Sequence, residues 1–276
     1  IIMIVYGVSA EVSISQLFIA GVLPGILLAA LFSGYIMLWA LRHPEQVPAA
    51  DVRMSFMQKL SESRSLIPVV LLIAAVLGSI YTGFATATEA AAVGVVGSLV
   101  LSAVQGSMTW GTFKDSLMGA TRLYCMIALI LAGAAFLTLA MGYIGLPRHL
   151  AEWIASLGLN QAQLIVALAV FYIILGCFLD GISMVVLTMG VLMPTVQAAG
   201  IDTIWFGIFI VLVVEMAQIT PPVGFNLFVL QGMTGRQLPW IAKVAMPMFL
   251  LMCGAVALIY VFPGIVTWLP QQMSAR

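Results

Sequence analysis

The residues best suited to chemistry in this chain form three short polar segments within a strongly apolar sequence. One segment is Thr220-Pro221-Pro222-Val223-Gly224-Phe225-Asn226. Its adjacent prolines remove two backbone donors and end the preceding helix, and Gly224 permits dihedrals that other residues avoid. Carbonyls freed in this way are costly in lipid unless they line a cavity or coordinate an ion. The segment therefore predicts a helix break with a binding site, and a simple proline kink is the alternative.

A second polar segment surrounds Asp180. It reads Gly176-Cys177-Phe178-Leu179-Asp180-Gly181-Ile182-Ser183 and lies between apolar stretches at 161–179 and 182–199. An ionised carboxylate inside a membrane is costly and indicates function. The glycine-containing turn between short legs predicts the tip of a re-entrant hairpin. With the hydroxyls of Ser183 and Thr188, the carboxylate suits a hard cation such as sodium. Alternatively, Asp180 caps the second leg, and the two roles are compatible.

The third segment is Thr86-Ala87-Thr88-Glu89. Thr86 or Thr88 can cap a helix that begins near Glu89, whose carboxylate also interacts favourably with the helix dipole. Capping alone explains these residues as well as a ligand role does. Glu215 is a further intramembrane carboxylate, and the pattern leaves open whether it pairs with a basic group or faces water.

The composition requires lipid as the solvent for much of the chain. Hydrophobic residues make up 63% and charged residues only 7%, whereas soluble domains have about 25% charged residues. The formal net charge is zero, so nothing in the sequence indicates nucleic-acid binding. Neither nucleotide-binding nor metalloprotease motifs occur, which argues against ATP-driven transport by this chain alone. The cysteines lie inside apolar runs without metal or disulfide spacing, and we interpret them as packing residues.

Elements of membrane-spanning length must position the polar segments, since about 20 apolar residues cross a bilayer. Residues 1–8 are typical of the end of a span, and 42–65 form a polar connection in which 51–64 suit an amphipathic helix. Two further stretches, 109–122 and 147–157, are interpreted as interfacial. The predicted spans and their interruptions are 16–41 with a bend at Pro24-Gly25, 66–82, 89–105, 123–145, the hairpin 161–199, the broken helix 203–233 and 239–262.

Basic residues indicate the orientation of these spans. They gather in 42–65 and 109–122, and Arg236 and Lys243 flank the last span, so the positive-inside rule places these parts in the cytoplasm. Arg148 then falls on the outer side. We interpret Arg122 and Arg148 as interfacial anchors rather than as anion contacts.

Several stretches resemble the large membrane subunit of tripartite ATP-independent periplasmic (TRAP) transporters. The stretch Gly78 to Gly94 resembles its G-x-FTPTEAAAV segment, and TPPVGFNLFV at 220–229 resembles a later hallmark. The resemblance extends over essentially the whole chain. Further matching stretches are Leu179-Asp180 through Pro194, Phe18 to Gly25 (FxAGxxPG), Phe262-Pro263 and Trp268-Leu269-Pro270.

The resemblance implies an all-α polytopic membrane protein of the elevator type, with inverted repeats, in a bacterial or archaeal inner membrane. It implies sodium-driven uptake of carboxylates such as C4-dicarboxylates, sialic acid, keto acids and sugar acids. A small four-helix membrane subunit and a periplasmic substrate-binding protein are the expected partners. Because the chain starts within an apolar element, we expect the C-terminal portion of a longer subunit. It would be a single domain over 1–276 with 1–41 ending the first repeat, 42–65 the cytoplasmic connection and 66–276 the second repeat.

The family's functional residues map onto the same polar segments. Backbone carbonyls hold sodium in the family, and the matching positions with the nearby carboxylate are Gly176, Ala217, Thr220, Val223 and Asp180. The residues expected to contact substrate are Ser183, Thr188, Pro221, Pro222, Gly224 and Asn226. Two departures from the family pattern are Ala217 in place of glycine, which a carbonyl ligand tolerates, and alanines at 85 and 87, which put a side-chain role there in doubt.

Two other functions compete with this interpretation. One is a stand-alone dicarboxylate or citrate carrier of the same superfamily, which would need neither partner. The other is an intramembrane aspartyl protease, which needs two apposed aspartates, and Asp180 has no intramembrane aspartate partner in the sequence. We therefore expect a transporter and not an enzyme, with the sodium ion as coupling ion and no cofactor.

Overall fold

The computed structural model describes residues 1–46, 58, 63–176, 178–221 and 224–274. Over these residues the chain is helical, with connecting turns and no strands. The chain divides into two compact units. The larger unit comprises Ile1–Ser33 and Cys125–Arg276, and the smaller unit comprises Gly34–Tyr124. The predicted repeat boundaries remain predictions.

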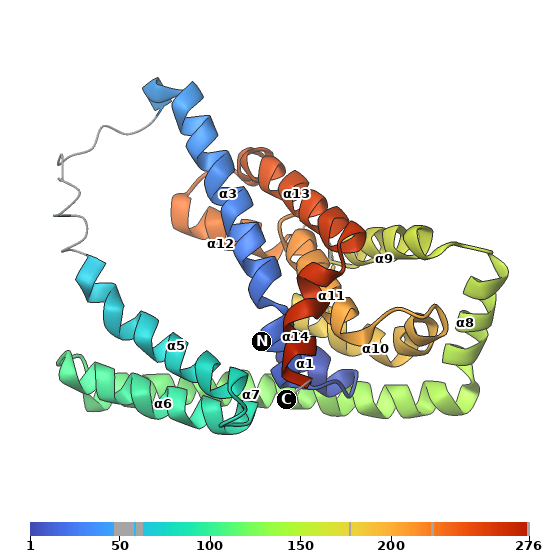
Figure 1. Ribbon diagram of the computed structural model, residues 1–276, viewed down its shortest axis with the longest axis horizontal. Coiled ribbons are helices and arrows are strands. Elements are labelled where there is room, and N and C mark those ends of the chain that lie inside the picture. Colours follow the sequence, from blue (N-terminus) through green and yellow to red (C-terminus); the bar gives the residue numbers. More distant parts are fainter. Residues whose placement is uncertain (47–57, 59–62, 177, 222–223, 275–276) are drawn as a thin grey trace. The chain divides into compact units, whose positions relative to one another are not determined.

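The larger unit contains the polar segment at the hairpin tip and the polar segment at the helix break (Figure 1). Its helices are α1 (Ile2–Ser9), α2 (Ile14–Ala20), α8 (Leu146–Ser156), α9 (Gln161–Leu175), α10 (Gly181–Ala198), α11 (Thr203–Gln218), α12 (Phe225–Thr234), α13 (Leu238–Val261) and α14 (Gly264–Ser274). Two more helices, α3 (Val22–Arg42) and α7 (Trp110–Ile144), belong in part to each unit.

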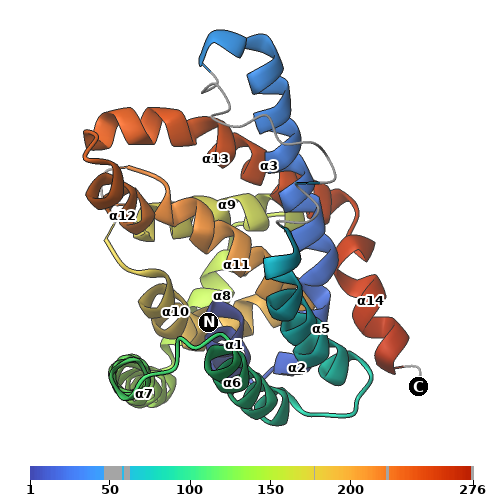
Figure 2. The same cartoon turned by 90° about the vertical axis from the view of Figure 1, so that its left-hand side faces the viewer.

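The smaller unit contains a helical hairpin made of α5 (Ile67–Tyr81) and α6 (Ala87–Val104), which pack against each other (Figure 2). A tight turn joins them, and Gly83 adopts a φ of 73° there, a left-handed conformation that favours glycine. The sequence prediction of two apolar legs at 66–82 and 89–105 is confirmed.

The lengths of the apolar helices distinguish spans from shorter elements. Within the described residues, five helical segments are long and apolar enough to cross a membrane: Ile14–Arg42, Ala87–Val104, Trp110–Ile144, Gly181–Ala198 and Leu238–Val261. Three apolar helices are shorter, namely α5, α9 and α11. The chain is therefore a polytopic all-α membrane protein, as the composition predicts.

Helix α11 forms the centre of the larger unit. It contacts α1, α2, α9, α10, α12, α13 and α14, and most of its side chains are buried. A helix that is apolar on all sides is stable only when other helices surround it. The indole of Trp205 near its start donates a hydrogen bond to the Ile259 carbonyl of α13 at 2.9 Å. The helix that ends at the break is thus packed against neighbours over most of its surface.

The first predicted span, 16–41, corresponds to α2 and α3, which together form the apolar segment Ile14–Arg42. The two helices are separated at Gly21. Pro24 has no N–H to donate to the Ala20 carbonyl one turn earlier, so the separation accompanies the proline. The bend at Pro24-Gly25 stays a prediction.

Residues 109–122 and 123–145 form one helix and not two elements, which corrects the predicted division. Helix α7 runs without interruption from Trp110 to Ile144. The charged residues Lys114, Asp115 and Arg122 are exposed on its first part, where they interrupt the apolar pattern without breaking the helix. Helix α14 was not predicted, and the amphipathic helix expected at 51–64 lies almost wholly outside the described residues.

Candidate functional site

The tip of the hairpin is built around the Asp180 carboxylate. Helix α9 ends at Leu175, and α10 begins at Gly181 with Asp180 as its N-cap. The Oδ2 atom of Asp180 accepts the backbone N–H groups of Ile182 at 3.1 Å and Ser183 at 3.2 Å. The Ser183 hydroxyl donates to Oδ1 at 2.5 Å. Asp180 therefore caps the second leg, as one reading of the sequence predicted, and its carboxylate stays exposed.

The helix break follows Gln218, the last residue of α11. The Thr220 hydroxyl donates to the Met216 carbonyl at 2.7 Å, and the Thr220 N–H donates to the Ala217 carbonyl at 3.2 Å. A Cβ atom on Gly224 would lie 2.7 Å from the Gln218 oxygen and 2.8 Å from the Thr220 oxygen. Only glycine fits against these two carbonyls, so the break predicted at this segment is a close turn of the backbone before α12.

The end of α9 meets the end of α11 at Gly176. A Cβ atom on Gly176 would lie 2.3 Å from the Cβ atom of Ala217 and 3.3 Å from the Met184 side chain. The structure thus brings together two of the positions that the sequence assigned to sodium. Asp180 lies four residues beyond Gly176, and Thr220 lies three residues beyond Ala217. Val223 and Pro222 fall outside the described residues.

A cavity of about 820 Å³ opens beside the hairpin tip and the end of α11. Its polar lining comes from Asp180, Glu215 and Gln218, and Phe18 and Met126 are among its apolar lining residues. None of the described lining residues has a basic side chain. Two carboxylates that line one cavity with mostly apolar walls attract cations. The arrangement is suited to cation binding.

Glu215 is linked to the second half of the broken helix. Its carboxylate interacts with the side chain of Asn226, a residue of α12 that the family resemblance assigned to substrate. Glu215 also lines a second, almost entirely apolar cavity of about 400 Å³ with Pro24, Leu28 and Met252. The carboxylate therefore borders two cavities, and whether it pairs with a basic group or faces water stays an open question.

Thr188 lies apart from the other predicted site residues. It is buried two turns into α10, where its hydroxyl lies 2.5 Å from that of Tyr172 and donates to the Met184 carbonyl at 2.8 Å. It borders a separate apolar pocket with Trp153 and Leu168 and does not line the cavity with Asp180. Pro221, another residue predicted to contact substrate, is exposed at the break.

Thr86 is the N-cap of α6 in the smaller unit. Its hydroxyl accepts the Glu89 N–H at 3.3 Å, and the Glu89 carboxylate accepts the Thr86 N–H at 2.8 Å. This reciprocal arrangement is a capping box. Thr88 lies in the first turn and is not the cap. The local structure of this segment is fully explained by the start of a helix.

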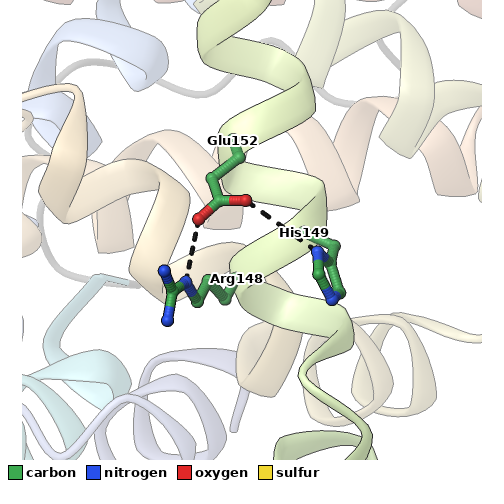
Figure 3. Close-up of polar contacts among 3 residues, drawn as sticks. All are labelled: Arg148, His149 and Glu152. Carbon is green, nitrogen blue, oxygen red and sulfur yellow. Dashed lines mark hydrogen bonds and ion pairs between the residues drawn. The ribbon is translucent and has the colours of Figure 1, made fainter.

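Helix α8 carries the one ion pair found among the described residues that joins an arginine to a carboxylate. The Arg148 Nε atom donates to Glu152 at 2.8 Å, and His149 lies 3.9 Å from the other oxygen of Glu152 (Figure 3). The hydrogen bond from Arg148 lowers the pKa of Glu152 below its ordinary value of 4.5. These side chains are exposed and are not part of the cavity lining, so Arg148 is not an anion contact in that cavity.

Gln218 is a cavity residue that the sequence reading missed. Glu215 and Gln218 are three residues apart, which puts them on one face of a helix that is otherwise apolar. Two polar residues at this spacing, directly before a proline break, are the sequence pattern that could have indicated Gln218 as a cavity residue.

The fold and cavity define a polytopic membrane protein with a charged site at a helix break, and the comparisons identify its family. Residues 1–265 match the family described as the DctM component of the tripartite ATP-independent periplasmic transporter. The chain belongs to this family, whose members are transporter subunits and not enzymes.

Similar proteins are large permeases of such transporters with different named substrates. The chain is 30% identical to the C4-dicarboxylate TRAP transporter large permease protein DctM of Pseudomonas aeruginosa, over 99% of the chain and 64% of that protein. It is 33% identical to the ectoine/5-hydroxyectoine large permease UehC of Ruegeria pomeroyi, over 97% and 62%. It is 28% identical to the sialic acid large permease SiaM of Vibrio cholerae, over 98% and 62%. The chain thus spans less than two thirds of these relatives.

Proposed function

We propose that this chain is the membrane-embedded part of a sodium-coupled transporter that imports a small carboxylate. The observation that carries the proposal is the cavity lined by Asp180 and Glu215, where the hairpin tip meets the helix break. Discontinuous helices supply ion and substrate sites in many secondary transporters. Membership of the DctM family supports the same assignment.

The charge of the cavity supports coupling to a cation. An anion that enters a site with two carboxylates is repelled by each of them. At about 4 Å and an effective dielectric constant of about 20, one such repulsion costs about 4 kcal/mol. A cation bound first removes this penalty, so the anion binds only to the cation-loaded site. We assign the cation to Asp180 and to the carbonyls of Gly176, Ala217, Thr220 and Val223.

The short first leg of the hairpin supports a re-entrant geometry. Helix α9 has 15 residues, which at a rise of about 1.5 Å per residue gives about 23 Å. The hydrocarbon core of a bilayer is about 30 Å thick. A leg of this length turns back inside the membrane and brings Asp180 to the interior. Movement of the hairpin and the broken helix as one body would then be the elevator step.

The partners and substrates in the proposal follow from the relatives. A TRAP large permease implies a small membrane subunit and a periplasmic binding protein, and hence the bacterial inner membrane. The relatives are named for C4-dicarboxylates, ectoine and sialic acid. These solutes share a carboxylate, and we propose a solute of this class. The contacts proposed for the solute are Ser183, Pro221, Pro222, Gly224 and Asn226.

Uptake into proteoliposomes tests the proposal. The assembled transporter with its binding protein is given succinate, sialic acid or ectoine under an inward sodium gradient. We expect uptake of one of them, and none under an equal potassium gradient. Uptake that is the same in sodium and potassium would contradict the coupling. Uptake without the small subunit and the binding protein would instead favour a stand-alone carrier.

A further inference from the structure

We infer that the side-chain amide of Gln218, which lies against the hairpin tip inside the cavity, binds the carboxylate group of the imported solute. The inference rests on the proposed function of this cavity and names a substrate contact within it. It starts from the placement of one residue between the hairpin and the break.

Gln218 contacts both elements of the site. A Cβ atom on Gly181 would lie 2.3 Å from the Gln218 Nε2 atom, so the amide packs directly on the first residue of α10. The main-chain oxygen of Gln218 faces Gly224, whose Cβ atom would lie 2.7 Å away. The side chain is therefore held at the hairpin tip while the backbone of the same residue forms the break.

The chemistry of the cavity makes this amide distinctive. Asp180 and Glu215 only accept hydrogen bonds when ionised, and the other described lining residues have apolar side chains or none. The backbone N–H groups of Ile182 and Ser183 already donate to Asp180. Among the described lining residues, Gln218 is thus the side chain with N–H groups to offer. No hydrogen bond to its amide is found within the described part of the chain.

A neutral donor suits a solute that must be both bound and released. The amide offers two N–H groups to a carboxylate without adding a permanent positive charge. Once cations neutralise Asp180 and Glu215, an anion can approach the amide at the hairpin tip. When the cations leave, the repulsion returns and the anion is expelled. An arginine in this position would hold the anion more tightly through a bidentate ion pair and would slow its release.

The test uses the assembled transporter carrying Gln218→Met, which keeps the length of the side chain, or Gln218→Glu, which replaces the donor by a third carboxylate. The probes are succinate, sialic acid and ectoine, and the probe that the wild type imports is followed. Loss of a hydrogen bond to a charged group raises the half-saturating concentration about 10- to 100-fold in Gln218→Met. Gln218→Glu lowers uptake further, because it repels the anion. Sodium-dependent thermal stabilisation is retained in both variants.

Matched controls are Gln197→Met and Gln197→Glu, which make the same changes at an exposed position of α10 outside the cavity lining. Both are expected to transport as the wild type does. A half-saturating concentration in Gln218→Met equal to that of the wild type overturns the inference. So does loss of the sodium response together with uptake, because that indicates a structural role. If the wild type imports none of the probes, the proposed function fails first, and this inference fails with it.

Discussion

Gly176 and Ala217 are in direct contact, with 2.3 Å between the position of a Cβ atom on Gly176 and the Cβ atom of Ala217. This contact joins the last turn of α9 to the last turn of α11. It brings together two residues from distant parts of the sequence. A glycine at 176 is the condition for this approach, because any side chain there would separate the two helix ends.

We predict that Gly176→Ala destabilises the protein by about 1–3 kcal/mol, as overpacking of a tight contact does. The denaturation midpoint of the purified protein in detergent measures the change. Gly254→Ala is the matched control, since a Cβ atom there meets no atom within 4 Å. Combining Gly176→Ala with Ala217→Gly transfers the methyl group from one helix to the other and should restore most of the loss. Equal stability of Gly176→Ala and Gly254→Ala would refute the packing argument.

The two roles of Asp180 can be separated by substitution. Serine keeps the cap without the charge, whereas alanine removes both. We expect Asp180→Ala to lose about 0.5–2 kcal/mol of stability and Asp180→Ser to lose little. Both variants should lose sodium-dependent thermal stabilisation.

Asp202 provides the control for the capping role, because it caps α11 by accepting the Trp205 N–H at 2.8 Å and does not line the cavity. Asp202→Ala should lose stability and keep the sodium response. A normal sodium response in Asp180→Ser would show that the carboxylate only caps the helix.

The hydroxyl pair of Tyr172 and Thr188 predicts coupled effects on stability. Each hydroxyl is buried between the hairpin legs, and a buried hydrogen bond contributes about 1 kcal/mol. Tyr172→Phe and Thr188→Val should each destabilise the protein, and the double variant should lose less than the sum. Tyr6→Phe also removes a buried hydroxyl, one that donates to the Thr203 carbonyl at 2.7 Å. Its effect should add to that of Thr188→Val, and strict additivity in the Tyr172 pair would disprove the coupling.

The ion pair on α8 predicts a small dependence of stability on pH. Arg148 holds the pKa of Glu152 below 4.5 in the folded protein, so the pair stabilises the fold above that pH. The contribution is lost as the pH falls through the lowered pKa. The difference in melting temperature between the wild type and Glu152→Gln should therefore be present at neutral pH and vanish in strong acid. Because both groups are exposed, 0.5 M KCl should reduce it. A difference in melting temperature that grows in acid would contradict the prediction that the ion pair stabilises the fold above the lowered pKa of Glu152.

The sequence predicted the elements whose ends carry strong local signals. The double proline and Gly224 fix the break, and Asp180 before Gly181 fixes the start of α10, because proline and capping side chains act within one turn of the backbone. A weaker signal led to a wrong prediction of a helix boundary within α7. Charged residues at 109–122 suggested a boundary, but charges on an exposed helix face do not end a helix.

The cavity was only partly accessible from the sequence. Asp180 stands out because it is charged in an apolar stretch. Gln218 does not, since a single amide beside a proline break reads as part of the turn. The contact between Gly176 and Ala217 depends on how two helices approach each other, and local patterns do not encode this distance. Resemblance to a family indicated these two positions, and the fold brings them into contact.

The burial of α11 determines how fast its amide protons exchange with water. Neighbours surround this helix from Trp205 to Ala217, so its amides should exchange only when the larger unit opens as a whole. Exchange should quicken after Thr220, whose N–H still donates to the Ala217 carbonyl of α11. The last turn of α11 is therefore a boundary between the slowest and the fastest parts of the backbone. A bound solute that closes the cavity would be visible there as a change in exchange rate.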